Sequence, residues 1–158
     1  MARMNRFEVD LDLARGMCAA ALSCAVDQGI LVSVAVVDAG GHLVAFERMD
    51  GAEIAGPVLA PDKAYTAVAH RAATDELADA VAPGGDLVGM HSADHGRYIA
   101  FAGGLPLWDG DRVIGGVGVS GGTGAQDRAW GAALVLLLIA FAVTLLARLV
   151  TARFALKR

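Results

Sequence analysis

The stretch from Val32 to Gly51, VSVAVVDAGGHLVAFERMDG, decides the fold because it holds two predicted strands and the turn between them. Residues 31–37 are rich in β-branched valine, and residues 42–49 form the returning strand. The residues between them, DAGG, are typical of a turn that Asp38 closes with its side chain. A lone hairpin is only marginally stable in water. The rest of the chain must therefore supply further strands, or helices that pack on this hairpin.

Helices are predicted on both sides of this hairpin in the sequence. Apolar residues recur at helical spacing from Leu11 to Gln28, with Asp10 as a candidate N-cap and Gly29 at the end. A second helix is predicted over residues 62–72. A short third helix is predicted over residues 74–81, with its first residue, a threonine, as the N-cap.

Three more strands are predicted over residues 98–102, 105–108 and 112–119, with glycine-containing turns between them. Together with the first hairpin they make five strands, joined by short links in the order helix, two strands, two helices, three strands, helix. Such links favour antiparallel pairing, with helices packed on the sheet. The predicted fold is therefore α+β, with a five-stranded antiparallel sheet flanked by helices.

The C-terminal part of the chain is strongly apolar. No charged residue occurs from Ala129 to Ala147, and a helix of that length spans roughly 28 Å, close to the ~30 Å hydrocarbon thickness of a bilayer. We expect a domain at residues 1–128, a transmembrane helix at 129–150 and a basic tail at 151–158. A helix that is apolar on all sides is otherwise buried, so burial within an oligomer or a partner protein is the alternative.

The predicted partner is therefore a membrane, although the side of the membrane stays open. Basic residues beyond the apolar run place the C-terminus in the cytoplasm by the positive-inside rule. A chain held by a C-terminal anchor, with no apolar secretory segment at its start, would instead keep its domain in the cytoplasm. The net charge of -4 disfavours nucleic acid as a partner.

Three blocks of sequence carry a resemblance to a known family. They are VAVVDAGGHLVAFERMDGA at residues 34–52, DKAYTA at 62–67 and GGLPLWDGDRVIGGVGVSGGTGAQD at 103–127. Their order resembles the GlcG/HbpS family of haem-binding proteins, to which the C-terminal domain of PduO-type proteins also belongs. The resemblance covers roughly residues 9–134. It implies a profilin-like sheet, haem as a cofactor and assembly as a homo-oligomer, whereas the long apolar C-terminal helix departs from the family pattern.

The histidines are the candidate ligands for a haem iron, because one axial ligand beside an apolar cleft is sufficient. His91, His95 and His70 are the candidates in that order, and the resemblance does not choose among them. His91 and His95 are four residues apart, but neither Glu nor Cys completes a zinc pattern around them, so no metal site is predicted.

Glycine-rich residues 116–121, GVGVSG, match the dinucleotide pattern G-x-G-x-x-G. No second parallel strand follows, so we interpret these glycines as residues that let the strand pack closely and turn into a helix. A helix start can hold an anion through its backbone amides. The residues that could hold a haem propionate in this way are Ser120, Gly121 and Gly122.

Three functions are compatible with these patterns. The first is membrane-anchored, non-catalytic binding of haem or a related tetrapyrrole, for sequestration, sensing or supply. The second is an accessory or scaffold subunit of a larger membrane complex. The third is an enzyme acting on a small organic acid, suggested by the family's association with glycolate metabolism, with Asp38, Arg48 and Lys63 as the residues to test. No nucleophile with a base is identifiable, so no catalytic residue is assigned.

Overall fold

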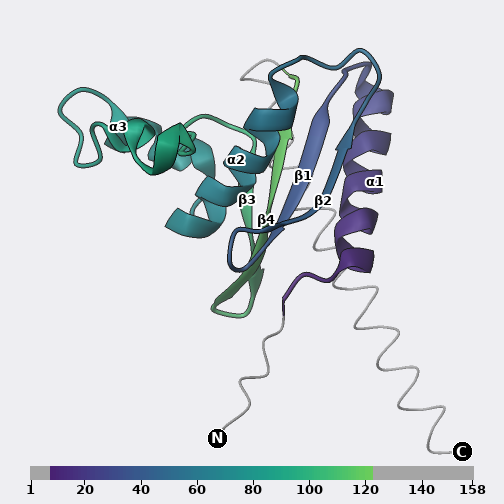
Figure 1. Cartoon of the computed structure of the whole chain (residues 1–158), viewed down its shortest axis with the longest axis horizontal. Helices are drawn as coiled ribbons and strands as arrows, with labels where there is room; N and C mark the ends of the chain where they lie inside the picture. The colour runs from purple at the N-terminus through teal and green to yellow at the C-terminus, as the bar shows by residue number, and fades with distance from the viewer. Residues whose placement is uncertain (1–7, 123–158) are drawn as a thin grey trace, which may run out of the picture.

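The computed structural model describes residues 8–122, which form one antiparallel sheet with helices on both faces (Figure 1). The strands pair in the order β2-β1-β4-β3, and every neighbouring pair is antiparallel. This confirms the α+β class and the antiparallel pairing. The four strands are β1 (Ser33–Asp38), β2 (Leu43–Arg48), β3 (Gly104–Asp109) and β4 (Arg112–Ser120).

Helix α1 (Leu11–Gln28) has the bounds that the sequence predicts. The Asp10 carboxylate accepts a hydrogen bond of 2.8 Å from the Leu13 backbone N–H. Gly29 ends the helix with a φ of 67°, a left-handed conformation that glycine adopts without strain. The helix packs its small residues on β1 and β2. The core on this face includes Ala14, Met17, Cys18, Ala21 and Ala25 of α1, with Val34, Val36, Val117 and Val119 of the sheet.

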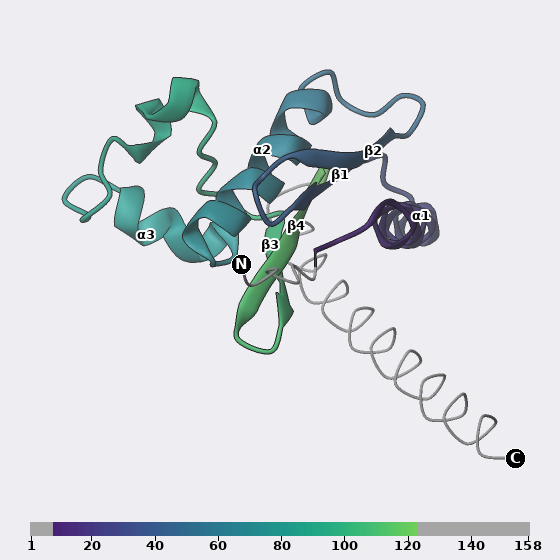
Figure 2. The same cartoon turned by 60° about the horizontal axis from the view of Figure 1, so that its bottom comes forward.

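Helix α2 (Gly56–His70) lies on the opposite face of the sheet (Figure 2). It begins earlier than the sequence predicts because Pro57 occupies the first turn, where backbone N–H groups have no partner within the helix. It also ends earlier, because Arg71 adopts a left-handed conformation with a φ of 54° and stops the run. The helix is thus longer than predicted at its start and shorter at its end.

Two glycines allow α2 to lie directly on the strands. A Cβ atom on Gly118 would overlap the carbonyl oxygen of Ala60, and one on Gly104 would overlap that of Lys63. Only glycine leaves room for the helix backbone at these two points. Gly116 and Gly118 of the GVGVSG motif thus serve close packing between β4 and α2, whereas the predicted turn into a following helix lies outside the described residues.

The predicted strand over residues 98–102 is wrong, and the sheet within residues 8–122 has four strands. The backbone of this segment bonds to threonine side chains in place of a neighbouring strand. Ile99 N–H donates to Thr66 Oγ1 at 2.9 Å, and Thr74 Oγ1 donates to the Phe101 carbonyl at 2.7 Å. Thr74 also accepts from the first N–H of β3 at 3.0 Å, so it holds this segment and is not the helix cap that the sequence predicts.

Residues 74–97 form a lobe that projects from the sheet on the side of α2 (Figures 1 and 2). The predicted helix over residues 74–81 is divided here into a 3₁₀ turn and one α-helical turn. An ion pair of 3.0 Å between Arg97 and Asp62 ties the end of the lobe to α2. The elements of the lobe are η1 (Thr74–Leu77), α3 (Ala78–Val81), η2 (Met90–Ser92) and η3 (Asp94–Gly96).

The predicted transmembrane helix at residues 129–150 lies outside the residues that the structure describes, as does the basic tail at 151–158. Within residues 8–122, no helix combines the length and the apolar character that crossing a bilayer requires. The predicted division of the chain into a domain, an anchor and a tail therefore stays a prediction.

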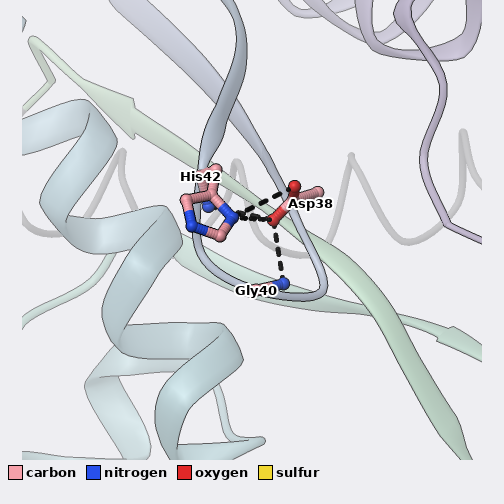
Figure 3. Close-up of polar contacts among 3 residues, drawn as sticks. All are labelled: Asp38, Gly40 and His42. Carbon is pink, nitrogen blue, oxygen red and sulfur yellow. Dashed lines mark hydrogen bonds and ion pairs between the residues drawn. The ribbon is translucent and has the colours of Figure 1, made fainter.

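The turn between β1 and β2 is organised by the Asp38 carboxylate (Figure 3). Its Oδ1 accepts hydrogen bonds from the backbone N–H groups of Gly40 and His42 at 2.8 and 2.9 Å, and His42 Nδ1 lies 3.2 Å from the same oxygen. Burial raises the pKa of Asp38, but the hydrogen bonds outweigh burial and hold the pKa below its usual value. Asp38 therefore closes the turn as predicted.

We expect Gly118→Ala to lower the free energy of unfolding by about 3 kcal/mol, because the added methyl group would push α2 off β4. Gly16→Ala is the matched control. Gly16 lies on the exposed side of α1 with nothing within 4 Å of an added Cβ, so this change should stabilise the helix by roughly 0.5–1 kcal/mol. Urea unfolding of the full chain measures both, and equal stability of the two variants would contradict the packing argument.

We expect Asp38→Asn to lower the free energy of unfolding by about 1 kcal/mol at neutral pH, because the turn loses a charged acceptor. The folded pKa of Asp38 is depressed, so its stabilising contribution is present above the unfolded pKa of ~3.9 and is lost as the pH falls through the folded pKa. Urea unfolding from pH 7 to about pH 3 should therefore show the two proteins converging in stability. A difference that does not change with pH would show that charge on Asp38 is irrelevant to the turn.

Candidate functional site

A cavity of about 600 Å³ opens between the two hairpin turns and the C-terminal half of α2. This volume lies within the range of about 300–1,000 Å³ that is typical of small-molecule sites. Its wall combines apolar, aromatic and charged side chains from four parts of the chain. Lining residues include Glu8, Tyr65, Val68, Arg71, Asp111 and Arg112.

Tyr65 connects the cavity to the lobe. The β1–β2 turn lies against its ring, since a Cβ atom on Gly41 would approach Tyr65 Cδ2 to 2.6 Å. Arg97 lies 3.8 Å from the centre of the same ring, and the Tyr98 ring lies 5.8 Å away. The pKa of Tyr65 is raised to about 12. The larger cause is its hydrogen bond with Asp94, and the second is burial. The phenol is therefore protonated at neutral pH and hydrogen-bonded to Asp94 of the lobe.

Two arginines lie at the cavity from different elements. Arg71 follows the last residue of α2, and its backbone N–H donates to the Ala67 carbonyl to cap the helix. Arg112 is the first residue of β4. Glu8 and Asp111 also line the cavity, so the site carries charges of both signs. No sequence pattern indicates this cavity, because its residues come from segments that lie far apart in the sequence.

All four histidines lie within the described residues, and none of them lines the cavity. His70 is the nearest in sequence, since it stands between two residues that do, and its ring packs edge-on against Tyr98 with 5.2 Å between ring centres. His91 and His95 are exposed in η2 and η3 of the lobe. Within residues 8–122, no three side chains of the His, Cys, Asp or Glu types are grouped to hold a metal ion.

The predicted propionate contact at Ser120, Gly121 and Gly122 lies at the end of β4. Ser120 is only 2% exposed, and its hydroxyl donates a hydrogen bond of 2.6 Å to Glu53 Oε1, a partner that the sequence analysis missed. Ser33, the strand partner of Ser120, is also buried, and its hydroxyl has no hydrogen-bond partner within the described part of the chain. The predicted helix start that would supply the amides falls outside the described residues, so the contact stays a prediction.

The three residues of the enzyme hypothesis do not form one site. Lys63 is only 1% exposed, donates from Nζ to the Val119 carbonyl at 3.0 Å and lies 4.8 Å from the centre of the Phe101 ring. Asp38 ends β1 at the turn, whereas Arg48 ends β2 at the other end of the hairpin. Lys63 therefore joins α2 to β4, while Asp38 and Arg48 lie at opposite ends of the first hairpin.

Comparison with known proteins gives a consistent result. The chain is 41% identical over 120 residues to an uncharacterised 15.0 kDa protein of the dhaT–dhaS intergenic region of Citrobacter freundii, with 76% of this chain and 84% of that protein covered. It is 44% identical over 108 residues to the corrinoid adenosyltransferase PduO of Salmonella typhimurium, which covers 68% of this chain but 32% of PduO. The chain thus matches about a third of PduO.

A solved structure extends the comparison to the fold. The crystal structure of a PduOC–haem complex superposes with a TM-score of 0.77 and 36% identity, covering 82% of this chain and 94% of that chain. A family model described as haem degrading protein HbpS-like matches residues 9–135. The four-stranded sheet, the helix pair and the glycine contacts described above all lie within these residues. The chain therefore belongs to the HbpS-like family.

Proposed function

We propose that this protein binds haem or a closely related tetrapyrrole, in a role of sequestration, sensing or supply. The observation that carries the proposal is the structural match to a relative solved in complex with haem. Membership of a family described as haem degrading points in the same direction. When bound, haem would supply an iron centre whose visible spectrum reports its axial ligands.

The cavity offers the chemistry that a haem group requires. An apolar wall from Val68, an aromatic side chain from Tyr65 and the cations of Arg71 and Arg112 match a ligand that has a flat apolar body and two carboxylates. The protein would thus bind the apolar ring of haem in the cavity and hold the haem carboxylates at the edge of the cavity.

His70 is the first candidate for the axial ligand on structural grounds. It follows cavity-lining residues at the end of α2, and its ring belongs to the aromatic cluster with Tyr98 and Tyr65. His91 and His95 lie in the lobe, and neither they nor their immediate neighbours line the cavity. The order of candidates proposed from the structure is therefore His70 before His91 and His95.

Haem degradation is the second candidate function, because the description of the matching family names it. The same spectroscopic sample distinguishes the two functions. A stable haem band under reducing conditions in air supports binding alone. A band that decays with release of iron supports degradation.

We further propose that residues 129–150 anchor the protein in a membrane and that the domain forms a homo-oligomer. The apolar run continues beyond residue 135, where the family match ends, which supports a role beyond the family domain. An accessory subunit of a membrane complex is the alternative, and it requires partner subunits that co-purify in constant ratio. Light scattering of the detergent-solubilised protein measures the number of copies.

We expect the full chain, purified in mild detergent, to take up haemin with a Soret band distinct from that of free haemin. His70→Ala should shift this band and weaken binding by roughly tenfold or more, because the iron loses an axial ligand. The matched control is His42→Ala, which removes a histidine whose side chain is 82% exposed in the β1–β2 turn. A wild-type protein that takes up no haemin would refute the proposal. A His70→Ala spectrum identical to that of wild type would show that His70 is not the axial ligand and leave His91 and His95 as the candidates.

Leu138→Arg should release the protein from membranes, because a charge at the centre of a spanning helix costs about 2.5–3.5 kcal/mol of insertion free energy. Leu138→Ala keeps the segment apolar and serves as the control. Alkaline carbonate extraction of membranes from expressing cells measures the effect. Wild-type protein in the soluble fraction would rule out the anchor.

A further inference from the structure

We infer that the cavity between the hairpin turns is a carboxylate-binding site in which Arg71 and Arg112 hold the acid group of the ligand. The inference rests on the proposed function for its first ligand, haem, whose two propionates are carboxylates. A free small organic acid has the same chemistry and is the other source. The two arginines are the groups at this cavity that carry positive charge.

The backbone of Arg71 is the first argument for this role. Its φ of 54° and ψ of 38° lie in the left-handed region, where a residue with a side chain is disfavoured and glycine is usual at a helix end. Strain of this kind is retained where the surrounding structure or the function requires the side chain. At Arg71 the side chain lines the cavity, so the strained position presents a guanidinium to a ligand.

The second argument is that both guanidinium groups are available. No ion pair to Arg71 or Arg112 occurs within residues 8–122, and both residues are exposed. Arg97, by contrast, is occupied by its ion pair with Asp62. A guanidinium presents a planar set of donors that fits a carboxylate in a bidentate manner. Arg71 comes from the end of α2 and Arg112 from the start of β4, so the two arginines can hold two carboxylates or clamp one.

The rest of the lining suits haem as the first of these ligands. Val68 and Tyr65 can cover the apolar body of such a ligand while its carboxylates lie at one edge. The ligand class is therefore a carboxylic acid, with haem and a free small acid as its two sources.

The test compares haemin with haemin dimethyl ester, in which both propionates are methylated, by Soret titration of the full chain in mild detergent. Arg71→Gly removes the guanidinium. Glycine adopts the left-handed backbone conformation of residue 71 without strain, so the variant should fold. Arg112→Gln removes the other charge. Arg15→Gln is the control, since Arg15 is an exposed arginine of α1 on the far side of the sheet.

We expect each cavity variant to bind haemin roughly tenfold more weakly and to bind the dimethyl ester as wild type does, because the ester has no charge to lose. Arg15→Gln should bind both as wild type does. In a second arm, succinate is titrated into haem-free protein by calorimetry. If succinate binding depends on Arg71 and Arg112 while haemin binding does not, the site holds a free acid, and the carboxylate inference stands.

The inference is overturned if neither haemin nor succinate binding changes in the two cavity variants. Loss of affinity for the dimethyl ester equal to that for haemin also overturns it, because the arginines would then act through the fold and not through a carboxylate. A wild-type protein that binds no haemin refutes the proposed function alone. The succinate titration then decides the inference by itself. Weaker succinate binding in the two cavity variants than in wild type supports the inference, and equal binding overturns it.

Discussion

The contact between the α2 backbone and β4 is the constraint on which the rest of the structure depends. Gly118 and Gly104 have no side chains, so the helix lies on the strands at backbone distance and not on a layer of large side chains. This close contact places Lys63 against Val119 and directs the end of α2 toward the two hairpin turns. The cavity, the aromatic cluster around Tyr65 and the strained Arg71 all follow from where α2 lies.

Much of the fold could be predicted because its signals are local. The cap at Asp10, the stop at Gly29 and the β-branched run of β1 act on their immediate neighbours, and the sequence pattern locates them correctly. The segment at residues 98–102 is wrongly predicted as a strand because its composition suits one. Its hydrogen-bond partners, Thr66 and Thr74, come from elsewhere in the chain. Local composition does not reveal a long-range competitor of this kind.

The candidate site was harder to predict for the same reason. Histidines were identified by type, yet a residue's type does not tell whether it lies between two cavity-lining residues on a helix, as His70 does, or in a projecting lobe, as His91 does. Arg71 and Arg112 belong to no motif. The end of α2 brings Arg71 to the cavity, and the turn between β3 and β4 brings Arg112 to it. The one sequence signal that could have indicated Arg71 is an arginine where a helix would ordinarily end in glycine.

The hydrogen bond between Lys63 and Val119 also has a consequence for the order of folding, since its two residues are 56 positions apart. The central strand pair β1–β4 is similarly non-local. Closing such long loops costs chain entropy before the contacts repay it, which slows folding relative to a chain with local contacts. On the ribosome, the first hairpin and α1 emerge well before β4. A nascent chain that stops short of residue 119 therefore lacks a complete β4, the strand that pairs with β1 on the side opposite β2. It also lacks the Val119 carbonyl that accepts the hydrogen bond from the Lys63 ammonium group.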